Sequence, residues 1–584
     1  MKKAWTRREF LVMSAIGAGS AVLSVGLSGC GSDNDGIRGA FNHGVASGDP
    51  AANAVILWTR VTPEKDGDVV VSWQVAEDDA FNQIVIDGST TTTVERDYTV
   101  KVDAAGLSAG TTYYYRFKVR GLYSPVGQTK TLPVGVVEQV RFATVSCSNF
   151  PAGYFHVYGE IATRNDLDAV IHLGDYIYEY GADGYASDYA EAMDRVVQPT
   201  TELYQLSDYR QRYAQYRTDT NCQAAHAAHP FIVVWDDHEI ANDIWRDGAE
   251  NHDNTEGDFD ERKLAALQAF FEWLPIRPVG NMAFDENIYR TFDYGELVVL
   301  HMLDTRVVGR DQQLDYADYI DSATGAIDAD GFTAAVSDSN RTLLGATQLS
   351  WLQGQLTTST AQWQVLGQQV LMGRMLLPAA IATQQLSIEQ YAELGALAVL
   401  AQRAAAGDPT LTADELAYLS ANADRLTADV QALLQLPSIP YNLDAWDGYA
   451  YEREVVLGTA MANQANLVVL SGDTHNAWAN QLTDASGNVA GVEFATTSVS
   501  SPGMEEYLNI ADDAAPATEA GLVQLVDGLK YCNINQRGYM VATFTESGAS
   551  AEWTFVNSVK STDYQVVAER AASMSATAGT ATLG

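Results

Sequence analysis

The chain has 584 residues, of which 47% are hydrophobic and 10% aromatic. This is enough apolar material for more than one folded domain, and it excludes disorder as the default interpretation. The formal net charge is −40. This charge argues against a nucleic-acid partner, because phosphate backbones are bound by clusters of Lys and Arg. A nucleic acid or nucleotide could then be a substrate only. We attribute the acidity mainly to a solvated surface, with cation binding as a second contribution.

The N-terminus has the pattern of an export signal. The sequence TRREFL (6–11) precedes a modest apolar stretch (11–27), as in twin-arginine signals. Glycines interrupt this stretch, which makes it a poor permanent membrane span. It ends in LSGC (27–30), a lipobox in which Cys30 would be lipidated. We predict a signal over 1–29, export by the twin-arginine machinery, and a periplasmic or cell-surface location with a membrane anchor at Cys30; ordinary cleavage nearby is the alternative.

Four cysteines are too few for a disulfide scaffold: Cys30, Cys147, Cys222 and Cys532. Whether Cys222 and Cys532 pair is left open.

An all-β region is expected first. After a short linker (30–38), residues 39–134 contain short runs rich in β-branched and aromatic residues, such as AVILWTRV and TYYYRFKV. Their near-regular spacing predicts a small fibronectin- or immunoglobulin-like sandwich.

From residue 135 the pattern changes to apolar strands that alternate with helical stretches, which predicts an α/β domain over 135–570. An Ala-, Leu- and Gln-rich insertion over 376–440 has helical periodicity, and we expect it to lie over the site or to form a dimer face. The small, polar residues 571–584 predict a flexible tail.

Four strands of this domain each end in an acid. The segments are AVIHLGD (169–175), FIVVWDD (231–237), LVVLHMLD (297–304) and NLVVLSGD (466–473). Near-continuous apolar runs are typical of strands covered on both faces. Ligands of open α/β sheets bind beyond the carboxyl ends of the strands, so these acids are expected to converge on one edge. A single acid there is usually a helix cap, but four of them beside Cys, His and Tyr are not all caps.

The donor types indicate a metal centre. Cys147, Tyr178 and His475 supply thiolate, phenolate and imidazole groups, which suit a transition metal such as Fe³⁺ or Zn²⁺. Carboxylates and amides suit Ca²⁺ or Mg²⁺. Asp175 has two oxygens and can bridge two metals, while Tyr178 binds one of them. A two-metal site favours in-line hydrolysis of a phosphate ester by a metal-bound hydroxide. His238 can protonate the leaving alkoxide as a general acid, or it can bind a phosphoryl oxygen.

The blocks SCSN, GDYIYE, WDDHE, LDTR, SGDTHNAW and EFATTSVSSPG, and the N-terminal FNHGVASGDP, resemble the calcineurin-like metallophosphoesterases, and most closely the PhoD-like alkaline phosphatases. The resemblance implies a four-layer α/β/β/α sandwich after the β domain, and an alkaline phosphatase with His238 and Asp237 as catalytic residues. It implies an Fe³⁺ ion held by Cys147, Asp175, Tyr178 and His475. It also implies one or two Ca²⁺ ions held by Asp175, Asp237, Asn242 and Asp473. Compared with purple acid phosphatases, Asp237 stands at the metal-binding amide position and Asp473 stands where a histidine is usual. These departures fit Ca²⁺ better than Zn²⁺, and Mg²⁺ is also less expected.

Two further polar residues follow strands. Arg306 can bind the substrate phosphate as a two-pronged donor, or it can hold Asp304 in a salt bridge, which we favour. Gln369 can lie at the same edge.

Three alternatives compete with a monoesterase. One is a phosphodiesterase or phospholipase D-like enzyme that acts on lipids, polymers or nucleotides, because a two-metal site serves both ester types. Another is a non-catalytic, metal-stabilised surface lipoprotein. The third is a serine hydrolase that uses Ser108 in GLSAG, which we reject because an aromatic strand, and not a helix, follows the motif.

Overall fold

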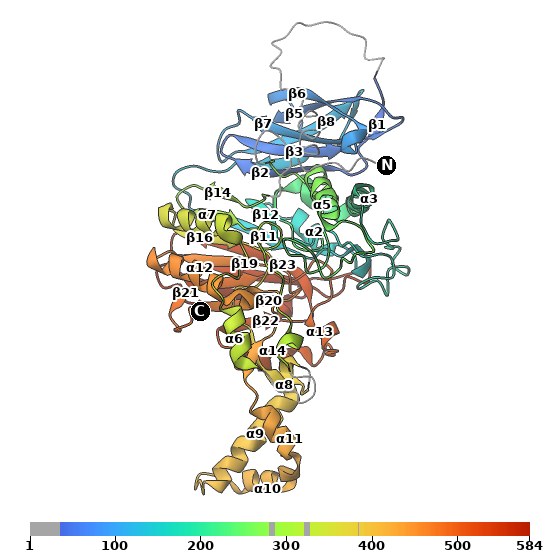
Figure 1. Ribbon diagram of the computed structural model, residues 1–584. Helices are drawn as coiled ribbons and strands as arrows, with labels where there is room; N and C mark the ends of the chain where they lie inside the picture. Colours follow the sequence, from blue (N-terminus) through green and yellow to red (C-terminus); the bar gives the residue numbers. More distant parts are fainter. Residues whose placement is uncertain (1–35, 279–286, 321–327, 384) are drawn as a thin grey trace.

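The computed structural model describes residues 36–278, 287–320, 328–383 and 385–584. An all-β region at the N-terminal end, a large α/β body and a helical arm succeed one another along the molecule (Figure 1). Among the described residues no helix is long and apolar enough to cross a membrane. The predicted signal and Cys30 lie outside the described residues.

Two sheets form the centre of the α/β body. The first contains, in spatial order, β25 (Ala572–Thr577), β24 (Gly548–Val556), β23 (Arg537–Thr545), β11 (Gln139–Val145), β12 (Ala169–His172), β13 (Pro230–Val233), β2 (Val45–Ala51), β3 (Ala54–Arg60) and β7 (Thr99–Ala105). The second contains β14 (Arg290–Tyr294), β15 (Val298–Met302), β16 (Trp363–Gly367), β19 (Leu467–Ser471), β21 (Val489–Ala495), β20 (Ala477–Thr483) and β22 (Leu529–Asn533). The pairs β11–β12, β12–β13, β15–β16 and β16–β19 are parallel.

One buried core joins the two sheets. Phe142 and Val170 of the first sheet share it with Leu300 and Val468 of the second. The first sheet contacts α2 (His156–Ala162), α4 (Thr220–Ala228) and α5 (Phe259–Trp273), and α3 (Leu206–Tyr216) packs on α5. The second contacts α12 (Ala450–Ala462) and α14 (Ala515–Leu525), and α7 (Gly345–Thr358) packs on α12. Helices therefore pack on both sheets, and the body is the predicted four-layer α/β/β/α sandwich. Strands that are covered on both faces need near-continuous apolar runs, and this sequence has them.

The N-terminal region is a sandwich, but it is not a separate one. One wall consists of β10 (Gly127–Lys130), β8 (Thr112–Val119), β5 (Val69–Ala76) and β6 (Ile84–Thr92). The other wall is β2, β3 and β7, which continue the nine-stranded sheet because β2 pairs in parallel with β13. The all-β sandwich expected over 39–134 is therefore present, and one of its walls is shared with the α/β body. Ser108 lies in the loop between β7 and β8, so no nucleophile elbow is present there.

The insertion is helical and projects from the body as an arm (Figure 1). Its two ends, β17 (Leu376–Pro378) and β18 (Ser438–Pro440), pair antiparallel. Between them lie α8 (Ala379–Ala382), α9 (Ile388–Ala405), α10 (Ala413–Asn422) and α11 (Ala428–Leu434). Ser387 and Gln390 form a capping box at the start of α9. The arm extends away from the body, so of the two placements left open its helices do not take the one over the site, and a dimer face stays a prediction (Figure 1).

The C-terminal segment is not the flexible tail that was predicted over 571–584. Its strand β25 pairs antiparallel with β24 from Trp553↔Ala572 to Gly548↔Thr577. The edge of the nine-stranded sheet offers unpaired backbone groups, and a small polar segment can pair with them at little steric cost. Cys147, Cys222 and Cys532 are free thiols, so the possible pairing of Cys222 with Cys532 is absent from the described structure.

Candidate metal centre

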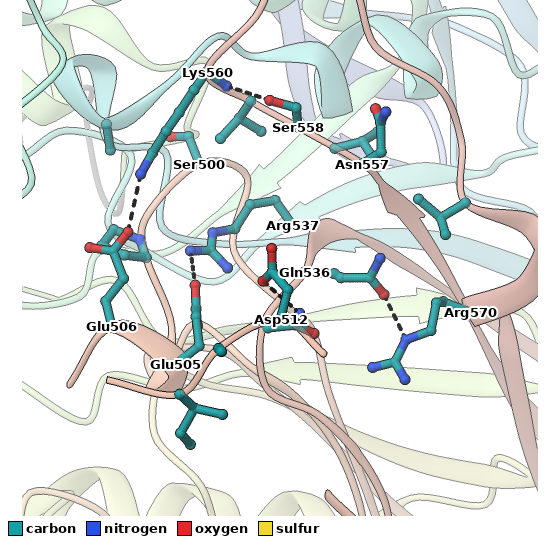
Figure 2. A pocket seen from close by; sticks show the side chains of 18 of the residues that line it. Ser500, Glu505, Glu506, Asp512, Gln536, Arg537, Asn557, Ser558, Lys560 and Arg570 are labelled. Carbon is teal, nitrogen blue, oxygen red and sulfur yellow. Dashed lines mark hydrogen bonds and ion pairs between the residues drawn. The ribbon is translucent and has the colours of Figure 1, made fainter. Parts of the chain in front are cut away.

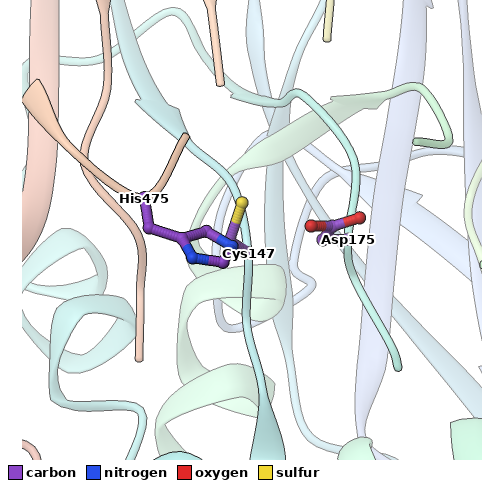
Figure 3. Close-up of side chains that lie close together, drawn as sticks. All are labelled: Cys147, Asp175 and His475. Atoms are coloured by element: carbon purple, nitrogen blue, oxygen red, sulfur yellow. The ribbon is translucent and has the colours of Figure 1, made fainter. Parts of the chain in front are cut away.

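Loops that follow two strands of the first sheet and one strand of the second bring the predicted iron donors together. Cys147 follows β11, Asp175 follows β12 and His475 follows β19, and their donor atoms lie within 4.8 Å of one another (Figure 3). The Tyr178 hydroxyl donates to Asp175 Oδ2 at 3.0 Å and lies 3.2 Å from His475 Nε2. Thiol, carboxyl, imidazole and phenol groups therefore surround one point.

Two carboxylate-rich groups adjoin this one. Asp175, Asp237 and His238 form the second group, and Asp236, Asp237 and Asp473 form the third, each within 4.8 Å. Asp175 belongs to two of the three groups and so does Asp237. The groups are therefore adjacent, as a centre with more than one cation requires. The sequence leaves open which of Asp236, Asp237 and Asn242 binds a cation, and both aspartates belong to the third group.

The backbone at this edge is strained. Cys147, Asp175, Asp473 and His475 have φ angles of 60°, 54°, 64° and 62°, in the left-handed region. A non-glycine residue in that region costs about 1–2 kcal/mol. Such residues cluster where a precise side-chain direction is needed, and all four of these carry donors of the first or third group.

His475 is a neutral imidazole with a defined tautomer. Its Nδ1 lies 2.7 Å from the Pro502 carbonyl, which can only accept, so Nδ1 carries the proton. Burial lowers the pKa of His475 to about 3. The unprotonated Nε2 therefore faces Tyr178 and the donor group, as a metal-binding imidazole requires.

The carboxylates fit a bound cation better than an empty pocket. Burial raises the pKa of Asp175 and of Asp473 well above their ordinary values, and it raises the pKa of Asp236 to about 7. Asp175 Oδ1 and Asp236 Oδ2 are buried without a hydrogen-bond partner. Buried oxygens without partners are costly, and hard cations bind carboxylate oxygens. These donors therefore fit a cation at this place.

Arg306 lies fully buried among the carboxylates and does not form a salt bridge with Asp304. Its guanidinium binds Asp236, Asp444 and Asp473, the last at 3.0 Å. Asp304 instead accepts hydrogen bonds from the backbone N–H of Arg306 and Val307. The favoured salt bridge is therefore wrong. Because all of these contacts are with carboxylates, Arg306 positions acids in this structure; contact with a phosphate would require some of them to be released.

His238 lies beside the donors and is held by Glu179. The distance from Nδ1 to Glu179 Oε2 is 2.8 Å, and both side chains are buried. Burial by itself would lower the pKa of His238, but the charges of Asp237 and Glu179 outweigh it and raise that pKa well above 6.5. The imidazole is therefore protonated at neutral pH, with Nδ1–H bound to Glu179 and Nε2–H free to donate.

Glu239, which was not predicted, connects two of the loops. Its carboxylate accepts backbone N–H bonds from Asp175, Tyr176 and Asp236, at 3.1 Å for Asp175 and 2.7 Å for Asp236. A single buried side chain thus fixes the loop after β12 against the loop after β13. Its place in the DDHE block was the available signal.

Two residues lie less centrally. The Asn242 amide donates to Glu250 at 2.8 Å, so only its amide oxygen could face a cation. Gln369 is buried and structural, because it donates to the Trp235 carbonyl and accepts from the Thr305 hydroxyl at 2.6 Å.

A cavity of about 1060 Å³ is lined by Ser500 and Pro502 among others, and Figure 2 shows its side chains. It adjoins the centre through Pro502, whose carbonyl lies 2.7 Å from His475 Nδ1. Its cations are paired: Arg537 with Glu505, Lys560 with Glu506, and Arg570 with Glu519. The donors of the three metal-binding groups do not line it.

Comparison with known proteins agrees with this geometry. The family model of the PhoD-like phosphatases matches residues 142–553, and that of their N-terminal domain matches residues 29–133. The chain is similar to alkaline phosphatase D of Bacillus subtilis (strain 168), with 34% identity over 534 residues that cover 88% of this chain and 77% of that protein. A solved structure described as the structure of PhoD superposes with a TM-score of 0.72 and 31% identity, over 93% of this chain and 91% of that one. The chain therefore belongs to the PhoD-like phosphatase family and is a phosphoric ester hydrolase.

Proposed function

We propose that the protein is an exported, metal-dependent alkaline phosphatase that hydrolyses phosphate monoesters. The observation that carries the metal dependence is the overlap of three donor groups through Asp175 and Asp237. The thiol and phenol of the first group suit Fe³⁺, and the oxygen-rich third group suits one or two Ca²⁺ ions. We assign Cys147, Asp175, Tyr178 and His475 to iron, and Asp175, Asp237, Asn242 and Asp473 to calcium. Asp236 is an additional candidate for calcium.

Bound cations would supply Lewis-acid activation of water and of the phosphoryl oxygens. The residues of the chain supply the rest. Asp175 and Asp237 hold negative charge at the points where the donor groups meet. Arg306 and Glu239 fix the loops that carry these acids. His238, protonated and oriented by Glu179, can donate its Nε2 proton to the oxygen of the departing alcohol.

His238→Ala is expected to lower kcat for a phosphate monoester by roughly 10²–10⁴-fold, the usual value of general acid help, while bound metal is retained. Activity measured beside metal content by mass spectrometry tests this. Loss of metal together with activity would make His238 a ligand, and unchanged turnover would remove it from the mechanism.

The function itself is tested with the purified mature chain at alkaline pH. Hydrolysis of p-nitrophenyl phosphate and of bis(p-nitrophenyl) phosphate is measured with and without a calcium chelator. We expect chelator-sensitive hydrolysis with a higher kcat/KM for the monoester. A preference for the diester would support the phosphodiesterase alternative. If the chelator has no effect and the protein contains no metal, the metal-dependent reading is wrong.

We also propose export by the twin-arginine route and lipid anchoring at Cys30, from TRREFL and LSGC. Mass spectrometry of the mature N-terminus is expected to find a diacylglyceryl group on Cys30. A free amino terminus at another residue would show ordinary cleavage instead.

A further inference from the structure

A second cavity, of about 360 Å³, adjoins the carboxylates of the metal centre. On one side the Asp243 N–H donates to Asp237 Oδ2 at 2.7 Å. On another side Asp444 binds Arg306, which also binds Asp473. The donors of the three metal-binding groups do not line this cavity, but Asp243 contacts one of them directly and Asp444 is linked to another through Arg306. The alcohol portion of an ester held at the centre would therefore extend towards this cavity.

Three aromatic rings line the cavity: Trp245, Tyr316 and Tyr441. The Tyr316 hydroxyl donates to the Pro440 carbonyl at 2.7 Å, and its ring stacks on Phe332 with the centroids 5.2 Å apart. This ring is therefore fixed before any ligand binds. Aromatic faces attract organic cations, and Trp does so most strongly.

The charged residues of the lining all have one sign. Asp243, Glu250, Asp315 and Asp444 line the cavity, and no lysine or arginine is among its described lining residues. Asp444 is neutralised by Arg306 and Arg310, whereas Glu250 and Asp315 have no ion pair among the described residues. The cavity therefore has an excess of negative charge beside aromatic faces.

We propose that this cavity binds the alcohol portion of the phosphate ester and selects esters of amino alcohols, in which that portion carries an ammonium group. The inference rests on the proposed function. A single metal ion would leave most of the volume empty, and aromatic rings are not ligands for hard cations. An anionic alcohol portion would be repelled, whereas an ammonium group gains contact with both rings and carboxylates.

The experiment compares choline phosphate with 3,3-dimethylbutyl phosphate, its uncharged carbon isostere, by phosphate release. We expect kcat/KM to be roughly 10-fold or more higher for choline phosphate. Trp245→Leu and Asp315→Asn should each reduce this ratio several-fold. Asparagine can still accept the bond that Asp315 accepts from the Ala317 N–H, so the local turn is kept. Asp188→Asn, at the other cavity, is the matched control and should leave the ratio unchanged.

Equal kcat/KM values for the two esters would overturn the proposal while leaving the phosphatase function intact. If neither these esters nor p-nitrophenyl phosphate were hydrolysed, the proposed function would fail separately. In that case the inference is tested by the binding of tetramethylammonium chloride, which is measured by tryptophan fluorescence and calorimetry. Binding that is weakened about 10-fold or more in Trp245→Leu supports the site, and equal or absent binding in both proteins overturns it.

Discussion

Asp175→Asn is expected to lower kcat/KM for phosphate esters by roughly 10³-fold or more, without a loss of stability in the cation-free protein. Asp175 contributes to two donor groups, so the amide removes a shared negative charge from both. Asparagine tolerates the left-handed backbone at this position, where φ is 54°. The shape of the site is therefore kept while its affinity for cations falls.

The expected stability follows from the direction of the pKa shift. Burial raises the folded-state pKa of Asp175 above its unfolded value, so the unfolded chain loses the proton first as pH rises. The free energy of unfolding therefore falls as pH rises from the unfolded-state pKa to the folded-state pKa, and it stays lower at higher pH. At neutral pH, in chelator, asparagine removes this cost. We expect the urea midpoint of Asp175→Asn to equal or exceed that of the wild type.

Metal content, phosphate release and urea unfolding in chelator check this prediction. Asp183→Asn, at an exposed acid eight positions further along, is the matched control and should leave all three unchanged. Activity within threefold of the wild type in Asp175→Asn would show that Asp175 does not bridge the donor groups.

Arg306→Met is expected to destabilise the cation-free protein by about 3–5 kcal/mol, the usual cost of removing one partner of a buried ion pair. The guanidinium is fully buried and binds Asp236, Asp444 and Asp473. Methionine fills similar volume but leaves these acids without their counter-charge. Calcium, if it binds the same acids, should restore part of the loss.

Urea unfolding of Arg306→Met in chelator and in excess calcium measures both effects. Arg306→Lys is the matched variant, since it keeps the charge but has one nitrogen in place of the three guanidinium nitrogens that each bind a different acid, and it should be intermediate. Unchanged stability in chelator would contradict the role of Arg306 as the counter-charge. An equal loss with and without calcium would show that the acids bind no calcium.

Family and fold class could be predicted from the sequence, and the structure and the comparisons confirm both. The convergence of Cys147, Asp175 and His475 was also predictable. Each follows an apolar strand, and ligands bind beyond the carboxyl ends of such strands. Cys147 and Asp175 follow parallel strands of the first sheet, whereas His475 follows β19 of the second, so the packing of the two sheets completes the group. Assignment of these residues as ligands remains a prediction, which metal analysis will test.

Other features depended on contacts between distant parts of the chain. Arg306 meets Asp444 across 138 positions, and Glu239 meets Asp175 across 64, so no local pattern paired them. The tail strand β25 and the extension of the sheet by β2 depend on free sheet edges, which are properties of the assembled sheets. The sequence by itself determined which chemical groups end the strands. The tertiary structure decided which acids share one counter-charge and which cavity adjoins them, because charge balance and cavity shape depend on packing between remote segments.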